Sequence, residues 1–435
     1  MLAGVAFVLR LAAALLPPDH FWAYTAYFDM ATQVVRGGGY CLAPGTLCAY
    51  FPPVYPTVLA ACILTGHPRP AIVLVSCLIG AATVWLVYRI GNFLFGNPSA
   101  WIAAAYAAVY PYYVWHDAVL QETATLTLVV AIAMYLLIRS HRSASFHLAL
   151  AAGIVLGLAV LTKANLGLFV PLASGWMLFF SSGNSAVRAR RCVWTLLGVC
   201  LVVGAWVART WIVTGSPVIY SNAGEALWQS NHALTFDYFP RQSIDAANDA
   251  EWKALSPEDR KELDALAGPD DGDVRPSTWS MRLRRRFFPA QFSATNQQGI
   301  RQSEWFWRRG MAFIKAHPWL TLRRAALKVW IAFSPVFSPA KSAAFEAVYL
   351  VFWLPLLVLS VLGGWKSRAQ WRDCGYFYTL ILSFALGSAV FWGHSSHRMY
   401  VEPYLMILAA RGIAEVSRSS APVSGPPSRY SAAVR

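Results

Sequence analysis

AIVLVSCLIGAATVWLVYRIGNFL, residues 71–94, contains 24 residues and a single charged side chain, Arg89. About twenty apolar residues in one run are enough for a helix to cross the hydrocarbon core of a bilayer. A run of this length without a Pro is read more readily as a membrane span than as a buried strand. We therefore expect residues 71–94 to cross a membrane as one helix.

Similar apolar runs recur along the chain and predict an all-α, polytopic transmembrane bundle of about ten spans. Two other segments are apolar without fitting a span. The run 54–66 is short and flanked by Pro, so we expect it at the membrane interface. The run 320–337 carries Arg323, Arg324 and Lys328, which favours an amphipathic surface helix. The ten expected spans lie near 2–17, 71–94, 100–115, 118–138, 146–162, 165–182, 192–213, 345–364, 374–393 and 400–416.

The composition excludes a soluble globular protein of ordinary make-up. Of 435 residues, 57% are hydrophobic and 13% are charged, whereas soluble domains carry about 25% charged residues. The formal net charge of +15 does not indicate nucleic acid, because the Lys and Arg residues lie between apolar runs rather than on one soluble face. Anionic head groups or a lipid phosphate explain the basic residues better. Residues 1–16 lack a cleavage site and an early basic residue, so we expect a retained first span rather than a signal peptide.

Basic residues in short loops predict the orientation, because such loops stay in the cytoplasm. With ten spans, three basic loops and the tail fall on one side, so both termini should be cytoplasmic in an inner (plasma) membrane. The predicted division is a module at 1–213 with a first outer loop at 18–70, an outer, periplasmic region at 214–344, C-terminal spans at 345–417 and a disordered tail at 418–435. The basic residues concerned are Arg139 and Arg142; Arg188, Arg190 and Arg191; Lys366, Arg368 and Arg372; and Arg418, Arg429 and Arg435.

Two of the seven cysteines lie outside the apolar runs, in the sequence CLAPGTLC. Cys41 and Cys48 bracket a Pro/Gly turn in the first outer loop, which would face an oxidising compartment. We therefore expect them to form a disulfide. The other cysteines lie in or beside spans, where Cys usually serves as a small apolar side chain.

Six segments, taken in order, resemble the GT-C superfamily of glycosyltransferases, in the group around protein mannosyltransferases and bacterial family 39-like enzymes. The first, residues 27–56, carries an aromatic residue before Ala31, a Gly-rich stop at Gly37–Tyr40 and a Pro-Pro-x-Tyr-Pro re-entry. The segments are YFDMATQVVRGGGYCLAPGTLCAYFPPVYP, YPYYVWHDAVLQETATL, GLAVLTKANLGLFVP, ARTWIVTGSPVIYSNAGEALWQSNH, SEWFWRRGMAFIKAHPWLTLRRAALKVW and HRMYVEPYLMILAARGI.

The resemblance implies an enzyme that moves a sugar from a polyprenyl-phosphate donor to an acceptor outside the cytoplasm. Its partners would be that donor, a glycan, lipid or protein acceptor, and membrane lipid, without nucleic acid. An inverting displacement needs a carboxylate to take the acceptor proton. It also needs cations beside the departing phosphate, whose charge grows in the transition state.

Three cations match the basic positions of the family. Lys163, Arg209 and Arg398 lie at the outer ends of three spans, and we expect them to converge on the donor phosphate. The alternative is that each side chain reaches the head groups separately. The run MRLRRRFF, with Arg282, Arg284, Arg285 and Arg286, is read as a solvated or lipid-surface face, with phosphate docking as the sharper alternative.

The catalytic carboxylate is the most open of the site residues. Glu122 has the best match to the family, but Ala23 stands where the family has its usual first-loop Asp. Asp19 lies one helical turn before Ala23 and Asp29 six residues after it. We rank Asp19 first because a four-residue step keeps nearly the same helix face, although Asp19 could instead be a helix N-cap after Pro18.

Further polar residues could support this chemistry. His116, Asp117, His397 and Tyr40 are the expected supporting residues. His116, His394 and His397 match no metal-ligand spacing, so the sequence predicts no certain cofactor and leaves a divalent metal as an unsupported alternative. Two other functions stay open: a transporter or flippase of lipid-linked sugars, and a homologue that became inactive with Ala23. The absence of related halves, which transporters often show, favours the enzyme.

Overall fold

A computed structural model describes residues 1–15, 21, 25–42, 47–143, 145–242, 244–266, 298–337, 341–393 and 395–419. In these residues the secondary structure is entirely helical, which confirms the expected all-α class. The membrane-region helices are α1 (Leu2–Ala14), α4 (Pro68–Phe95), α5 (Asn97–Val109), α6 (Pro111–Asp117), α7 (Thr123–Arg142), α8 (Phe146–Val160), η2 (Ala164–Leu168), α9 (Phe169–Phe180), α10 (Ser185–Thr214), α18 (Ala343–Lys366), η5 (Arg368–Gln370), α19 (Trp371–Val390), η6 (Ser395–Arg398) and α20 (Glu402–Ser419). The others are α2 (Thr25–Val35), α3 (Val54–Ile63), α11 (Ala223–Ser230), α12 (Thr235–Tyr238), α13 (Ile244–Ala254), α14 (Pro257–Leu266), α16 (Gln298–Ala316) and α17 (Pro318–Phe333).

Each of the ten expected spans coincides with a helix, but the helices differ in length. Five are long and apolar enough to cross a membrane by themselves. Several others are shorter: α1 has 13 residues, α8 has 15 and α9 has 12. The five long segments are α4, α7, α10, α18 and residues 368–390, which comprise η5 and α19.

The expected span 100–115 is interrupted near its end. α5 ends at Val109, Tyr110 is extended, and α6 begins at Pro111. A Pro disfavours helical backbone at the residue before it and cannot donate to the preceding turn. The expected span 118–138 likewise begins later, at Thr123, so residues 118–122 form a corner between α6 and α7.

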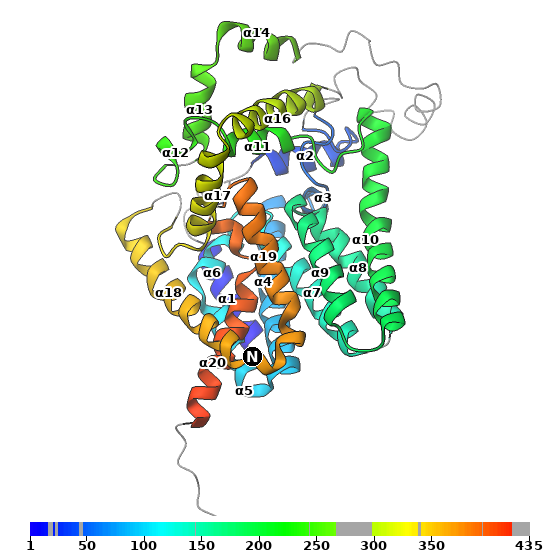
Figure 1. The fold of residues 1–435 in the computed structure, drawn as a ribbon, viewed down its shortest axis with the longest axis vertical. Helices are drawn as coiled ribbons and strands as arrows, with labels where there is room; N and C mark the ends of the chain where they lie inside the picture. Colours follow the sequence, from blue (N-terminus) through cyan, green and yellow to red (C-terminus); the bar gives the residue numbers. More distant parts are fainter. Residues whose placement is uncertain are drawn as a thin grey trace, which may run out of the picture.

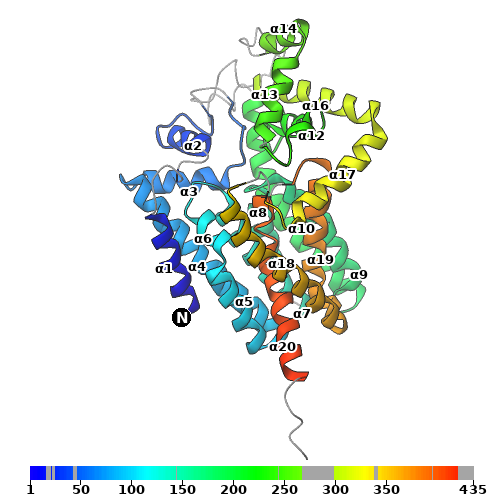
Figure 2. The same ribbon diagram turned by 90° about the vertical axis from the view of Figure 1, so that its left-hand side faces the viewer.

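The helices form a long bundle with a smaller helical cap at one end (Figures 1 and 2). The cap comprises α2, α11, α12, α13, α14 and α16. The N-terminus and the end of α20 both lie at the opposite end of the bundle (Figure 1). The loop between α7 and α8, the loop between α9 and α10 and the end of α18 lie at that opposite end too, as the basic loops predicted.

Small residues bring α8 and α10 into close contact. A Cβ on Gly198 would lie 2.5 Å from the carbonyl oxygen of Leu150, so only Gly fits there. Gly153 faces the Thr195 backbone in the same way. Such small-residue contacts let helices in a membrane approach closely. They hold the first half of α8 against α10.

Candidate active site

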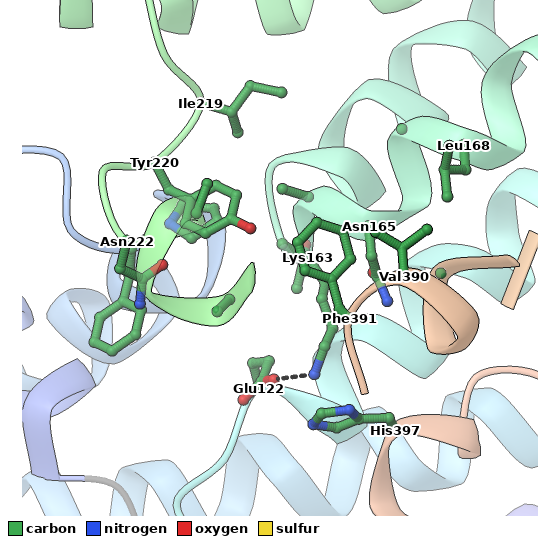
Figure 3. A pocket seen from close by; sticks show the side chains of 18 of the residues that line it. Glu122, Lys163, Asn165, Leu168, Ile219, Tyr220, Asn222, Val390, Phe391 and His397 are labelled. Carbon is green, nitrogen blue, oxygen red and sulfur yellow. Dashed lines mark hydrogen bonds and ion pairs between the residues drawn. The ribbon is translucent and has the colours of Figure 1, made fainter. Parts of the chain in front are cut away.

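A cavity of about 660 Å³ lies between the bundle and the cap. We call it the reaction cavity. It is built from five parts of the chain: the first loop, the corner before α7, the turn after α8, the segment after α10, and the end of α19 with η6 (Figure 3). Its lining includes Tyr27, Phe51, Glu122, Lys163, Asn165, Leu168, Tyr220, Asn222, Phe384, Val390, Phe391 and His397.

One ion pair lies in the wall of this cavity. The Nζ atom of Lys163 is 2.9 Å from Oε1 of Glu122 (Figure 3). Lys163 is extended, with φ −147° and ψ 110°, between the end of α8 and η2, and Glu122 directly precedes α7. The two side chains are 20% and 9% exposed, so the pair is largely enclosed and still reaches the cavity.

The surroundings keep the Glu122 carboxylate ionised. Burial raises the pKa of Glu122. The charge of Lys163 and its hydrogen bond to Glu122 lower that pKa, and a hydrogen bond from Tyr27 lowers it as well. The net pKa of Glu122 lies below its ordinary value. An ionised carboxylate at neutral pH can accept a proton, as a general base must.

The ion pair lies between two sides of the cavity. Leu168, Val390 and Phe391 lie on the Lys163 side together with Asn165, and we call this the apolar side (Figure 3). Tyr220 and Asn222 lie on the other side together with Ile219, and we call this the polar side. Ligand sites combine an apolar wall with a few polar groups that fix orientation. This cavity therefore suits a ligand that has both an apolar part and polar groups.

Arg209, expected beside Lys163, is not among the residues that line the cavity. Its guanidinium lies over the rings of Tyr40 and Trp206, at 5.7 Å and 4.8 Å from their centroids, and donates to the carbonyl of Cys48. Cys48 forms the expected disulfide with Cys41. Arg209 thus holds the disulfide loop against the end of α10, and Tyr40 takes part in the same contact.

Arg398, the third expected cation, is fully buried away from the cavity wall. Its Nε donates to Oε1 of Glu402 at 2.8 Å and its Nη1 to the carbonyl of Ala332 at 2.7 Å. Its guanidinium carbon is 3.5 Å from the centroid of the Trp353 ring. The structure therefore does not bring Lys163, Arg209 and Arg398 together, and of the three only Lys163 lines the cavity.

The first-loop carboxylates do not supply a described base in the cavity. Asp29 is exposed on α2 and is not among the lining residues. Asp19 and Ala23 lie outside the described residues. His394 and the arginines at 282, 284, 285 and 286 lie outside them too. Glu122 is consequently the predicted carboxylate that the structure places in the site.

The supporting residues divide between the site and the core. His397 lines the cavity near the ion pair (Figure 3). His116 is bonded to Gln121 at 3.0 Å, and Asp117 pairs with the buried Arg10 of α1. Burial lowers the pKa of His116 to about 4, so it is neutral at pH 7. Asp117 and His116 thus shape the corner before Glu122 rather than line the cavity.

The sequence did not lead us to predict four neutral polar residues of the site. Tyr27, Asn165, Tyr220 and Asn222 all line the cavity. Each lies within one of the six family-like segments, which was the signal that could have singled them out. In the part of the chain that the structure describes, no group of three His, Cys, Asp or Glu residues could hold a metal ion.

The comparisons agree with this geometry. Residues 51–208 match the PMT_2 family, described as dolichyl-phosphate-mannose-protein mannosyltransferase. This range contains both Glu122 and Lys163. No curated protein matches the chain.

Solved structures match the chain at low sequence identity. The oligosaccharyltransferase AglB from Archaeoglobus fulgidus, in complex with an inhibitory peptide and a dolichol-phosphate, matches with TM-score 0.52 and 14% identity over 96% of this chain and 50% of its own. Its apo form matches with TM-score 0.54 and 12% identity over the same shares. ArnT from Cupriavidus metallidurans, bound to undecaprenyl phosphate, matches with TM-score 0.42 and 14% identity over 96% of this chain and 77% of its own.

This chain spans about half the length of the archaeal enzyme that it matches. The likeness is therefore one of architecture, and the sequence match in the N-terminal half adds the family pattern. The resemblance read from six short segments is confirmed in two respects: the chain shares the fold of the oligosaccharyltransferase AglB, and its residues 51–208 match the PMT_2 family.

Proposed function

We propose that this protein is a membrane glycosyltransferase that moves a sugar from a polyprenyl-phosphate donor to an acceptor in the reaction cavity. The observation that carries the proposal is the Lys163–Glu122 pair, a cation and an ionised carboxylate in the wall of one cavity. The reaction would occur at the capped end of the bundle, which we assign to the outer, periplasmic face. The basic loops at the opposite end support that orientation.

Lys163 would stabilise the leaving group. As the bond between the anomeric carbon and the phosphate oxygen breaks, both electrons stay with the phosphate, and its charge increases next to the ammonium. The ammonium has three N–H donors, so it can bind the carboxylate and a phosphate oxygen at once. The isoprenoid chain would leave along the apolar side, past Leu168 and Val390.

Glu122 would act as the base. The acceptor hydroxyl attacks the anomeric carbon, a new carbon–oxygen bond forms, and the hydroxyl proton passes to the carboxylate. Attack from the side opposite the phosphate inverts the anomeric centre. Acceptors would approach from the polar side, past Tyr220 and Asn222 (Figure 3).

The test is transfer of radiolabelled sugar from a panel of polyprenyl-phosphate sugars, with purified protein in nanodiscs and lipid, glycan and peptide acceptors. We expect labelled product with the wild type and none with the Lys163→Ala variant. The same protein in sealed liposomes separates the alternatives. Label that crosses the bilayer on its intact lipid, without transfer, would overturn the enzyme in favour of a flippase.

A further inference from the structure

A second cavity of about 260 Å³ lies between the first loop and the cap. We call it the side cavity. It is lined by residues from the first loop, the start of α11, α13, α14 and α16, and apart from Asn222 none of them has a role in the transfer step described above. Its principal residues are Tyr50, Ser221, Asn222, Glu225, Trp252 and Gln302.

The two cavities share a thin wall. Asn222 lines both of them. Tyr50 and Ser221 line the side cavity, whereas their chain neighbours Phe51 and Tyr220 line the reaction cavity. The Ser221 amide donates to the carbonyl of Ala49 at 2.7 Å and ties the two wall segments together. A ligand that occupies the side cavity therefore lies directly beyond the polar side of the reaction cavity.

The side cavity has an unused polar atom. Ser221 is 4% exposed, and its Oγ has no hydrogen-bond partner. An unpaired buried hydroxyl is unfavourable, so such groups usually have a partner. A hydroxyl of a bound ligand would provide the missing partner.

The other side chains specify the kind of ligand. Glu225 lines the side cavity, and its partners include Tyr50 and Gln229, from which it accepts at 3.4 Å and 3.1 Å. A carboxylate offers about four lone-pair sites, so it accepts from several donors at once. Trp252 is 46% exposed and presents part of its ring. An aromatic face beside a carboxylate, an amide and a hydroxyl suits a ring with C–H groups on one face and hydroxyls at its edge. Cavities for drug-sized ligands measure about 300–1,000 Å³, so this smaller one suits roughly one such ring.

We propose that the side cavity is an acceptor subsite that binds a sugar ring, so that the acceptor is itself a carbohydrate-bearing molecule. This proposal rests on the proposed function. The ring stacks on Trp252, and its hydroxyls donate hydrogen bonds to Glu225 and Ser221. The reacting hydroxyl of the acceptor then extends past Asn222 towards Glu122.

The test measures saccharide binding apart from donor binding. Saturation-transfer NMR on the full-length protein in nanodiscs uses the methyl glycosides of glucose, galactose, mannose and N-acetylglucosamine. We expect a signal from at least one of them, reduced at least fivefold in both Trp252→Ala and Glu225→Gln. Trp252→Phe should restore most of the signal, because it keeps an aromatic face. The matched control is Trp307→Ala, since Trp307 is 44% exposed on α16 and lines neither cavity.

Binding of undecaprenyl phosphate is measured on the same samples. If it is retained in every variant while the saccharide signal falls, the subsite is supported. A saccharide signal unchanged in Trp252→Ala and Glu225→Gln, or lost equally in Trp307→Ala, overturns the subsite. Binding of a basic peptide that depends on Glu225, without saccharide binding, also overturns it. If the wild type does not bind undecaprenyl phosphate, that result counts against the proposed function instead.

Discussion

Two cation–carboxylate pairs of this protein have nearly the same geometry and opposite surroundings. Nζ of Lys163 is 2.9 Å from Oε1 of Glu122, and Nε of Arg398 is 2.8 Å from Oε1 of Glu402. The first pair is 20% and 9% exposed and lines a cavity, whereas both members of the second are completely buried. A pair enclosed on every side can only hold helices together, whereas one with an open side can exchange a partner for a substrate. The exposure of the side chains therefore distinguishes a pair that can bind substrate from a pair that stabilises the fold, whereas the distance between the charged atoms does not.

The largest expected effect comes from the open pair. Glu122→Gln keeps the size of the side chain and removes the base, so we expect transfer to fall about 10²–10⁴-fold. Binding of undecaprenyl phosphate should remain, because Lys163 is unchanged. The assay is radiolabelled transfer alongside a donor-binding measurement. Glu304→Gln, at an exposed position of α16, is the control and should behave as the wild type.

The sealed pair should affect stability instead. Arg398→Met leaves Glu402 as an unpaired carboxylate in the core, which we expect to lower the free energy of unfolding by about 3–5 kcal/mol. The double variant Arg398→Met/Glu402→Leu should recover most of that loss, because both charges are then absent. Thermal unfolding followed by circular dichroism measures both. If the double variant folds stably but cannot bind undecaprenyl phosphate, Arg398 belongs to the donor site and the comparison fails.

A third pair, Arg10 with Asp117, tests how tightly a sealed pair is packed. Gly80 contacts it so closely that a Cβ there would collide with both side chains. We expect Gly80→Ala to destabilise the protein by about 1–3 kcal/mol, as overpacking does. Gly175→Ala is the matched control, because nothing lies within 4 Å of its added Cβ and Ala favours a helix. Equal unfolding temperatures for the two variants would show that the corner before Glu122 yields easily.

The smallest effect concerns Lys328, a buried cation whose hydrogen-bond acceptors are Asn231 Oδ1 and two backbone carbonyls at the end of α19. Burial first, and then Arg324, lowers the pKa of Lys328 from 10.5 to about 7. Above pH 7 the folded state gives up this proton while the unfolded state keeps it, so stability rises with pH. We expect a gain of about 1 kcal/mol between pH 7 and pH 8.

The Lys328→Met variant should lose that gain. The free energy of unfolding is measured at pH 7 and at pH 8 for both proteins. Between these two pH values the variant should gain about 1 kcal/mol less than the wild type. Parallel curves for the two proteins would mean that Lys328 keeps its ordinary pKa in the fold.

The helices could be predicted from the sequence because the bilayer imposes a length and a composition on each of them. The interruption at Tyr110 was missed, but it could have been predicted because Pro111 follows Tyr110. Interfacial residues such as Lys163 could be found for the same reason, as cations at span ends are costly without a partner or water.

The direction in which each side chain points could not be predicted in the same way. Arg209 and Arg398 lie near the outer ends of apolar runs just as Lys163 does, but hydropathy does not specify how a helix is rotated about its axis. Arg398 did carry a local signal, because Glu402 follows it by four residues and can pair with it. The pairing of Lys163 with Glu122, 41 residues apart, depends on the packing of α7 against α8 and has no such signal.

The shortness of α8 has a consequence for the depth of the chemistry. Its 15 residues measure about 22 Å at 1.5 Å per residue, against a hydrocarbon core of about 30 Å. α8 begins just after the basic end of α7. In the orientation that we propose, Lys163 at the far end of α8 would therefore lie several ångströms below the outer head groups, and any tilt would place it deeper. A donor can then present its phosphate without withdrawing its isoprenoid chain from the bilayer. The same geometry makes turnover sensitive to acyl-chain length, because a thicker membrane would leave the ammonium deeper in hydrocarbon.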